Sequence, residues 1–311
     1  MNEAALLLAL AAAVAAGTPL VLAGLGELLT ERSGVINVGV EGMMLIGAVC
    51  AFLVADATSS IALGLLAGAV AGGMLALLHA FLCVTMRANQ IVSGLALVIF
   101  GTGVATFIGR PIEGQPLAVR IQKAPVPYLS DIPYIGDVLF RQDLVVYLSW
   151  GLVAVAVVYL NRTRLGLAVR AVGENPATAD VTGIRVAAIQ YVHTVIGGLL
   201  AGGSGAYLML ARAPNWSQAG TVSGLGWIAV ALVVFSSWKP ARLLLGAYLF
   251  GLALRLNFNL QAAGVHGIPA EFLAMVPYLL TIGLMIALSA RTSRLPGAPA
   301  ALGMPYIRTE R

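Results

Sequence analysis

The feature that most constrains the fold of this chain is a series of apolar runs, each about as long as a membrane is thick. An α-helix needs roughly 20 apolar residues to cross a hydrocarbon core of about 30 Å. Nine runs qualify, at approximately 4–29, 39–56, 61–86, 90–109, 143–160, 187–210, 222–237, 241–260 and 270–290. The second and the seventh are short. The sequence therefore predicts an all-α fold, a polytopic membrane helix bundle with about nine, or ten, transmembrane helices.

Composition favours a single transmembrane domain over residues 1–311. The chain is 59% hydrophobic and 10% charged, with a mean hydropathy of +0.93, which is far from the composition of a water-soluble domain. The first apolar run has no Lys or Arg before it, whereas a cleavable secretory signal begins with a basic region. We therefore expect this run to be the first span.

The distribution of cations predicts the orientation, because cytoplasmic loops of membrane proteins carry an excess of Lys and Arg. With the N-terminus outside, twelve of the 18 cations lie on one face and five on the other, and Arg255 remains inside a span. The first face is then cytoplasmic. We therefore expect 110–142, which is rich in proline, to be an extended extracytoplasmic loop with at most one surface helix. The loop 161–186 and the tail 291–311 are expected to be cytoplasmic.

The apolar pattern is interrupted most strongly between the first two runs. The polar residues there are Glu27, Glu31, Arg32, Ser33, Asn37 and Glu41. Irregular backbone at membrane depth survives only where it is buried in protein or lines a wet cavity. We therefore expect a broken helix near the transport pathway. The alternative is an ordinary cytoplasmic turn, with Glu31 and Arg32 in water and Asn37 capping the next helix.

A second polar segment punctuated by glycine, AGTVSGLGW at 219–227, precedes another short apolar run. Transporters often consist of two repeated halves whose interrupted helices meet near the substrate. On this basis two pseudo-repeated halves are predicted, and Asn37, Glu41, Ser223 and Trp227 face a shared substrate pathway. Asn37 and Glu41 are four residues apart and could share a helix face. The alternative is that both segments are glycine-rich turns without a special role.

The loop after the fifth run contains a predicted surface helix. Asn175 is a favourable N-cap and Pro176 a favourable first helical residue. Asp180 suits the positive end of this helix, and Gly183 suits a C-terminal position with positive φ. We therefore expect a helix over about 176–181, although any cytoplasmic loop can contain one.

The sixth run carries small residues at three- and four-residue spacing, which lets membrane helices approach closely. They are Gly197, Gly198, Gly202, Gly203 and Gly205. Ser204 lies among them and is expected to serve packing, not catalysis. His79 and His193 are expected to find partners inside the bundle.

Three separated motifs resemble permease subunits of ATP-binding cassette (ABC) importers of the branched-chain amino acid, ribose and nucleoside group. They are ERSGVINVGVEGMMLIGA at 31–48, TRLGLAVRAVGENPATADVTGI at 163–184 and GWIAVALVVFSSWKPARLLLGAYLFG at 226–251. The first is similar to the nucleoside or simple-sugar branch. In the third, Ser236, Ser237 and Trp238 stand where the resemblance leads us to expect a glycine near the turn.

The resemblance implies a permease subunit for nucleosides, or alternatively for ribose-type sugars, in a bacterial-type plasma membrane. It implies as partners a second permease, favoured to be a paralogue, an extracytoplasmic substrate-binding lipoprotein and a cytoplasmic ATPase that holds ATP and Mg²⁺. The contact with the ATPase is expected in the loop 161–186. The residues expected to make it are Arg170, Gly173, Glu174, Asn175, Pro176, Ala177, Asp180 and Gly183.

The chain itself is expected to be non-catalytic, without a metal or cofactor of its own. A phosphate-binding loop needs Gly before Lys, and neither Lys123 nor Lys239 follows a glycine. The three histidines are far apart and both cysteines lie in apolar stretches, so neither pattern indicates a metal site. A secondary transporter or channel, which would couple to ions through intramembrane carboxylates, and a membrane enzyme remain as alternatives; no nucleophile–base cluster supports the latter.

Overall fold

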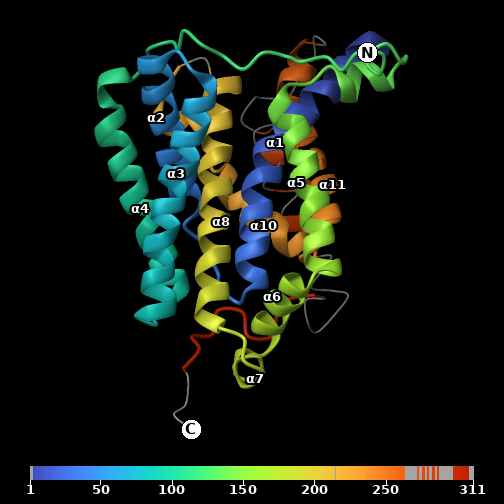
Figure 1. Ribbon diagram of the computed structural model, residues 1–311. Coiled ribbons are helices and arrows are strands. Elements are labelled where there is room, and N and C mark those ends of the chain that lie inside the picture. The colour runs from blue at the N-terminus through green and yellow to red at the C-terminus, as the bar shows by residue number, and fades with distance from the viewer. Residues whose placement is uncertain are drawn as a thin grey trace.

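The protein is described by a computed structural model that covers residues 3–213, 215–262 and 297–307, with single positions between 272 and 286. The long helices run side by side in one bundle (Figure 1). This arrangement confirms the predicted all-α membrane fold.

The helix bounds follow the predicted spans closely. In chain order they are α1 (Glu3–Arg32), α2 (Val40–Thr58), α3 (Ile61–Ala80), α4 (Gln90–Gly109), α5 (Leu144–Arg162), α6 (Arg164–Glu174), α7 (Pro176–Val181), α8 (Val186–Tyr207), α9 (Gln218–Thr221), α10 (Leu225–Phe235) and α11 (Pro240–Ala262). Short π-helical turns extend α3 and α8. Within the described residues, α1 to α5 and α8 are long and apolar enough to cross a membrane. The predicted span 270–290 lies mostly outside the described residues.

The seventh predicted span is much shorter than a membrane is thick. Helix α10 has 11 residues, which at 1.5 Å per residue is about 16 Å, or roughly half of the hydrocarbon core. It begins after Gly224, whose φ is 81°. The prediction of an interrupted helix at this place is therefore confirmed.

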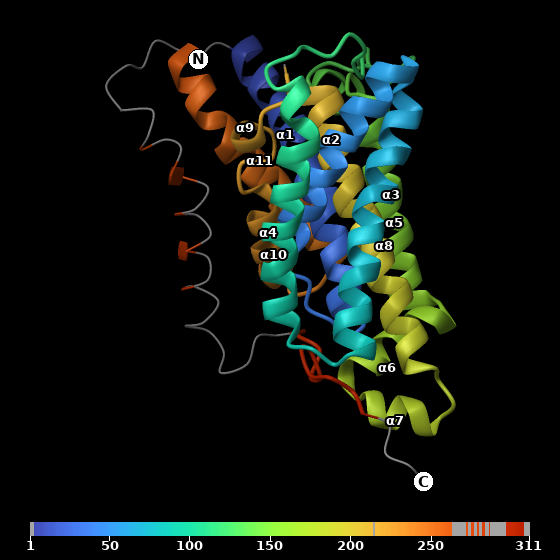
Figure 2. The same cartoon turned by 90° about the vertical axis from the view of Figure 1, so that its left-hand side faces the viewer.

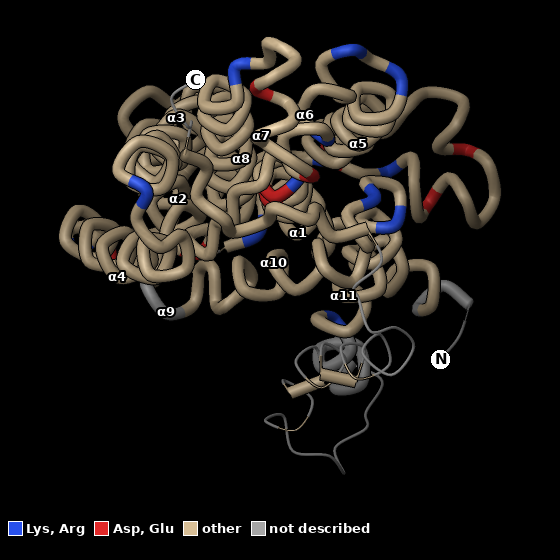
Figure 3. The backbone as a smooth tube through the Cα atoms, turned by 90° about the horizontal axis from the view of Figure 1, so that it is seen from below, with Lys and Arg blue, Asp and Glu red and all other residues tan. Residues whose placement is uncertain are grey.

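The bundle has an inner and an outer set of helices. The apolar windows of α1, α2 and α8 are 67%, 72% and 67% buried, whereas those of α3, α4 and α5 are 33%, 28% and 33% buried. Figure 3 shows α1 at the centre, surrounded by its neighbours. The outer helices present large apolar side chains such as Phe107, which suits contact with lipid.

The glycines of α8 let the inner helices approach each other. A Cβ at Gly197, Gly202 or Gly205 would lie only 1.9–2.3 Å from an atom of α1, α3 or α2. At Gly203 the nearest atom is 3.8 Å away. The buried Ser204 hydroxyl donates to a backbone carbonyl of α1 at 2.7 Å. The prediction that this stretch serves packing is confirmed.

The turn between α10 and α11 has the left-handed backbone that favours glycine, although serine and tryptophan occupy it. Ser237 and Trp238 both have φ of 53°, a left-handed conformation that costs residues other than glycine about 1–2 kcal/mol. The end of α1 holds this turn. Arg32 donates from Nε and Nη2 to the Trp238 carbonyl at 3.2 and 2.9 Å, and Glu31 Oε2 accepts from Trp238 Nε1 at 2.5 Å.

The connecting segments gather at the two ends of the bundle. The start of α1 and the loop 110–142 lie at one end, and α6, α7 and residues 297–307 lie at the other (Figures 1 and 2). Within the loop are a 3₁₀ turn (Arg110–Ile112) and a π-helical turn (Gly136–Phe140). The bundle thus separates 110–142 from 161–186, as the predicted topology requires.

Candidate functional site

The connection between α1 and α2, residues 33–39, is called the first break here, and it lies inside the protein. Its first amides donate to backbone carbonyls at the end of α1, and buried side chains accept from two that follow. Glu27 Oε1 accepts from the Asn37 amide at 2.9 Å, and Gln90 Oε1 accepts from the Ile36 amide at 2.7 Å. Non-helical backbone at membrane depth needs such partners, because lipid offers none.

Two further helices reach the first break. His79 of α3 donates from Nε2 to the Ile36 carbonyl at 2.9 Å, and Gln190 of α8 donates to the Ser33 carbonyl at 3.4 Å. The prediction of irregular backbone buried in protein is therefore confirmed. The alternative of a turn in water is wrong for Glu31, which is only 3% exposed.

Asn37 does not share a helix face with Glu41, as its spacing had suggested. Helix α2 begins only at Val40, and the Asn37 side chain accepts from the Gly39 amide at 3.0 Å and contacts Met43 Sδ at 3.4 Å. This local turn ends before the helix starts, so the i, i+4 relation is lost. The N-cap of α2 is Gly39, and Asn37 does not cap the helix.

Glu41 joins the first break to the start of α10. Its Oε1 accepts from the Gly224 amide at 2.9 Å, and its Oε2 accepts from the Gly226 amide at 2.7 Å. These donors belong to the positive N-terminal end of α10, where a carboxylate is favourable. A Cβ at Gly226 would lie 2.6 Å from the Glu41 backbone, so a glycine is needed for this approach. The two interrupted segments therefore meet.

The residues around the start of α10, 222–227, are called the second break here. Ser223 has φ of 51°, is exposed, and donates from Oγ to the Gly220 carbonyl at 2.8 Å. Trp227 is 41% exposed. Of the four predicted pathway residues, Glu41, Ser223 and Trp227 thus lie around one helix start, whereas Asn37 is buried in the first break.

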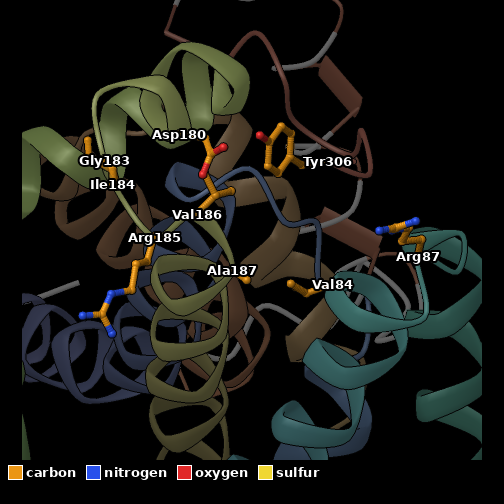
Figure 4. Close-up of a pocket in the computed structure, with 9 residues that line it drawn as sticks. All are labelled: Val84, Arg87, Asp180, Gly183, Ile184, Arg185, Val186, Ala187 and Tyr306. Atoms are coloured by element: carbon orange, nitrogen blue, oxygen red, sulfur yellow. The ribbon is translucent and has the colours of Figure 1, made fainter. Parts of the chain in front are cut away.

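The surface helix predicted at 176–181 is present as α7. Asn175 Oδ1 accepts from the Thr178 amide at 3.0 Å, Pro176 is the first helical residue, and Gly183 has φ of 87°. The prediction that Asp180 lies at the positive end of this helix is wrong. It lies in the last turn of this six-residue helix, where a carboxylate does not complement the positive end. Figure 4 shows it beside Val186, at the start of α8.

The other predicted coupling residues differ in exposure. Glu174, Asn175 and Ala177 are exposed, Pro176 and Arg170 are partly buried, and Gly173 is buried. A Cβ at Gly173 would lie 2.3 Å from the carbonyl oxygen at the end of α1. Gly173 therefore permits packing beneath the exposed tip.

Residues 297–307 cross this end of the bundle and form hydrogen bonds both to α6 and to the first break. The Ala301 amide donates to the Gly173 carbonyl at 2.9 Å, and the Gly303 amide donates to the Gly34 carbonyl at 3.1 Å. Figure 2 shows this segment, in red, passing beneath the bundle toward α7. The sequence predicted only a tail here, because an apolar pattern reports no contact between backbone groups.

A cavity of about 350 Å³ lies beside the end of α7. Its walls come from the end of α3, the connection between α7 and α8, and Tyr306 of the C-terminal segment. Arg87 and Arg185 lie on opposite sides of it (Figure 4). Helix α7 packs on α6 and α8 through the buried Ala179, whereas its exposed residues Ala177 and Thr178 can be contacted from outside.

Relatives of the whole chain are known. TsgC13 of Haloferax volcanii, a candidate glucose ABC transporter permease protein, is 42% identical over 96% of both chains. The guanosine ABC transporter permease protein NupQ of Bacillus subtilis is 36% identical over 94% of both chains. The nucleoside ABC transporter permease protein NupC of Lactococcus lactis is 35% identical, again over 94% of both.

A solved structure and a family comparison agree with these relatives. A candidate metal-chelate type ABC transporter in an inward-facing conformation matches with a TM-score of 0.53 and 14% identity, over 90% of this chain and 85% of that one. At this identity the likeness shows the fold alone. Residues 9–288 match the family described as the permease component of the branched-chain amino acid transport system. The chain therefore belongs to this family and is a membrane permease of the ABC transporter class.

Proposed function

We propose that this chain forms one side of the translocation pathway of an importer for nucleosides. The observation that carries the proposal is the meeting of the two breaks, where Glu41 of α2 binds the start of the half-length helix α10. Transporters commonly place their substrates where interrupted helices meet near the bilayer midplane. Ser223 and Trp227 lie at this place with exposed side chains, and they are the residues proposed to face the cargo.

The exposure of Ser223 and Trp227 also supports a second permease. One chain leaves this surface uncovered, whereas a passage must be closed on all sides to exclude lipid. A second permease, proposed to be a paralogue, would complete the wall. Asn37 and Glu41 would then support the wall from behind, since both are buried.

A separate ATPase is proposed to bind at the tip formed by α6 and α7. Asn175 and Ala177 are exposed there, at the end of the bundle that carries most Lys and Arg residues. That end is proposed to be cytoplasmic, with ATP and Mg²⁺ held by the ATPase. A substrate-binding lipoprotein is proposed to dock at the other end, near 110–142. That end is proposed to be extracytoplasmic, as is the N-terminus.

Nucleosides and sugars are the two candidate cargoes. Two relatives named for guanosine and nucleoside transport support the first, and the 42% identity to a candidate glucose permease favours the second. The exposed indole of Trp227 suits a nucleobase, because every base has a face that stacks on an aromatic ring. We therefore place nucleosides first.

Uptake into vesicles tests the cargo. The chain would be reconstituted with the second permease, ATPase and binding protein that accompany it, and labelled guanosine and glucose would be offered in parallel. We expect ATP-dependent uptake of guanosine that excess unlabelled nucleoside blocks and excess glucose does not. Uptake of glucose alone would overturn the assignment to nucleosides, and uptake without ATP would overturn the importer.

Cross-linking tests the position of the ATPase. In a variant without Cys50 and Cys83, Ala177→Cys is expected to cross-link to the ATPase subunit. Gln115→Cys, which is exposed in the loop at the other end, serves as the matched control and is expected to react with impermeant thiol reagents added outside cells. Cross-linking at Gln115 in place of Ala177 would reverse the proposed orientation.

A further inference from the structure

A second cavity lies at the same end of the bundle, between the ends of α1 and α5, helix α6 and the turn before α11. Its volume is about 470 Å³. Its polar wall includes Arg32, Arg170, Lys239 and Asn161, and its apolar wall includes Val157 and Leu160. Arg170 is also one of the residues expected to contact the ATPase, but neither the proposed cargo pathway nor the exposed tip at Asn175 and Ala177 uses the rest of this cavity.

The cavity carries an excess of positive charge. Three of its lining residues are cations and none is an acid. Arg32 is attracted by Glu174 and repelled by Arg170. Glu174 is itself exposed and accepts a hydrogen bond from the Ala300 amide at 3.3 Å. The wall of the cavity therefore presents positive charge that an anion could meet.

One arginine of the cavity also has a hydrogen-bond donor that remains unused within the described part of the chain. Arg170 Nε is buried and has no hydrogen-bond partner among the described residues. Arg32 uses Nε and Nη2 to hold the Trp238 carbonyl. A buried donor without an acceptor is costly, typically about 1–3 kcal/mol. An anion in the cavity would remove this cost.

The position of the cavity indicates the source of the anion. Helix α5 is long enough to span the membrane and ends at Arg162, so Val157, Leu160 and Asn161 occupy its last turns, where lipid headgroups begin. Figure 3, viewed from this end, shows several Lys and Arg positions near α5 and α6. Basic pockets between membrane helices on the cytoplasmic side suit acidic lipid headgroups.

We propose that this cavity binds the phosphate of an anionic phospholipid. Arginine presents planar donors that match phosphate oxygens, and Arg170 and Arg32 supply them here. Lys239 adds a point charge from the rim, and Val157 and Leu160 contact the first part of an acyl chain. The lipid would brace the ends of α1, α5 and α6 against the turn that precedes α11.

Thermal melting of the full chain in nanodiscs tests the proposal. The nanodiscs contain phosphatidylcholine alone or with phosphatidylglycerol, and Arg170→Gln and Arg170→Lys are compared with Arg164→Gln. Arg164 is an exposed cation at the start of the same helix that does not line the cavity. For the native chain we expect phosphatidylglycerol to raise the melting temperature by about 2–4 °C. Arg170→Gln should lose most of this rise, Arg170→Lys should keep part of it, and Arg164→Gln should keep it all.

The alternatives give different results. Equal stabilisation of Arg170→Gln and the native chain would overturn the site, as would equal loss in Arg164→Gln, because only general surface charge would then act. Inorganic phosphate that stabilises as well as the lipid would show a site for a free anion and overturn the lipid assignment. Melting in phosphatidylcholine alone checks that each variant folds.

Discussion

The two breaks in this permease have similar sequences but are held in different ways. The first break, residues 33–39, is bonded by side chains of four helices and by the C-terminal segment. The second break, residues 222–227, is held by the carboxylate of Glu41, and it leaves Ser223 and Trp227 exposed. Glycine and polar residues in an apolar chain therefore mark a broken helix without telling how firmly it is held.

The difference has consequences for function. A backbone bonded from many sides resists local opening, whereas one with few buried contacts opens more readily. We therefore expect the first break to be a rigid joint between α1 and α2. The second break is expected to be the adjustable element, anchored at one end by Glu41 and exposed on the side where cargo is proposed to pass.

The largest effect is expected from Glu41→Ala. The substitution leaves the amides of Gly224 and Gly226 without their acceptor, and hydrogen bonds to charged groups are worth about 1.5–3 kcal/mol each. We expect a loss of about 3 kcal/mol of stability, seen as a strongly lowered melting temperature in detergent. Glu41→Gln keeps one acceptor oxygen and should lose about half as much.

The matched control for Glu41 is Asp56→Ala, which removes an exposed carboxylate near the other end of α2. It should change stability by less than about 0.5 kcal/mol. Native melting of Glu41→Ala would show that the second break is held by contacts other than this carboxylate. The contrast between the two breaks would then be lost.

A smaller effect is expected in the first break from Gln90→Leu. The new side chain has a similar size but cannot accept from the Ile36 amide, and an unsatisfied buried amide costs about 1–3 kcal/mol. We expect about 2 kcal/mol of lost stability, because the bonds from Glu27 and His79 remain. Val92→Ala, at an exposed position of α4, is the control for substitutions in this helix. A loss as large as that of Glu41→Ala would mean that the first break is not held redundantly.

The contact between the C-terminal segment, residues 297–307, and the first break should contribute less still to stability. Gly303 has φ of 79°, and a Cβ there would lie 2.9 Å from the Ile36 side chain. Gly303→Ala should cost about 1 kcal/mol from the left-handed backbone alone. Met304→Ala, at a neighbouring exposed side chain, should cost almost nothing. Equal melting temperatures of both variants and the native chain would show that the C-terminal segment does not stabilise the first break.

Much of the fold was predictable because its signals are local. Runs of apolar residues set the helices, and Asn175, Pro176 and Gly183 act within a single turn, so α7 was placed to the residue. The spacing of the glycines in α8 also predicted close packing of this helix, which the structure shows. The seventh span was predicted to be short because its apolar run, 222–237, is short.

The partners of the polar residues were not predictable, since they depend on contacts distant in the sequence. Nothing near Glu41 indicates that its acceptors serve amides 183 and 185 residues away. The turn at Ser237 and Trp238 is likewise held by the end of α1, more than 200 residues earlier. Spacing alone gave the wrong relation between Asn37 and Glu41, because it assumed a helix where the Asn37 side chain forms a local turn.

Trp227 is expected to affect stability less than Glu41 does but to affect transport strongly. Trp227 is 41% exposed, so Trp227→Ala should cost about 1 kcal/mol of stability, clearly less than Glu41→Ala. Stacking of a base on an aromatic ring is worth about 1–3 kcal/mol, so guanosine uptake per folded molecule should fall roughly tenfold and be partly restored in Trp227→Phe. Phe107→Ala, which removes an aromatic that is 80% exposed on α4, is expected to leave uptake unchanged. If Trp227→Ala lowers the melting temperature as Glu41→Ala does while uptake per folded molecule stays normal, the exposed side of the second break packs the protein and does not meet the cargo. If it lowers mainly uptake, the two breaks divide the work, one holding the helices and the other contacting what passes between them.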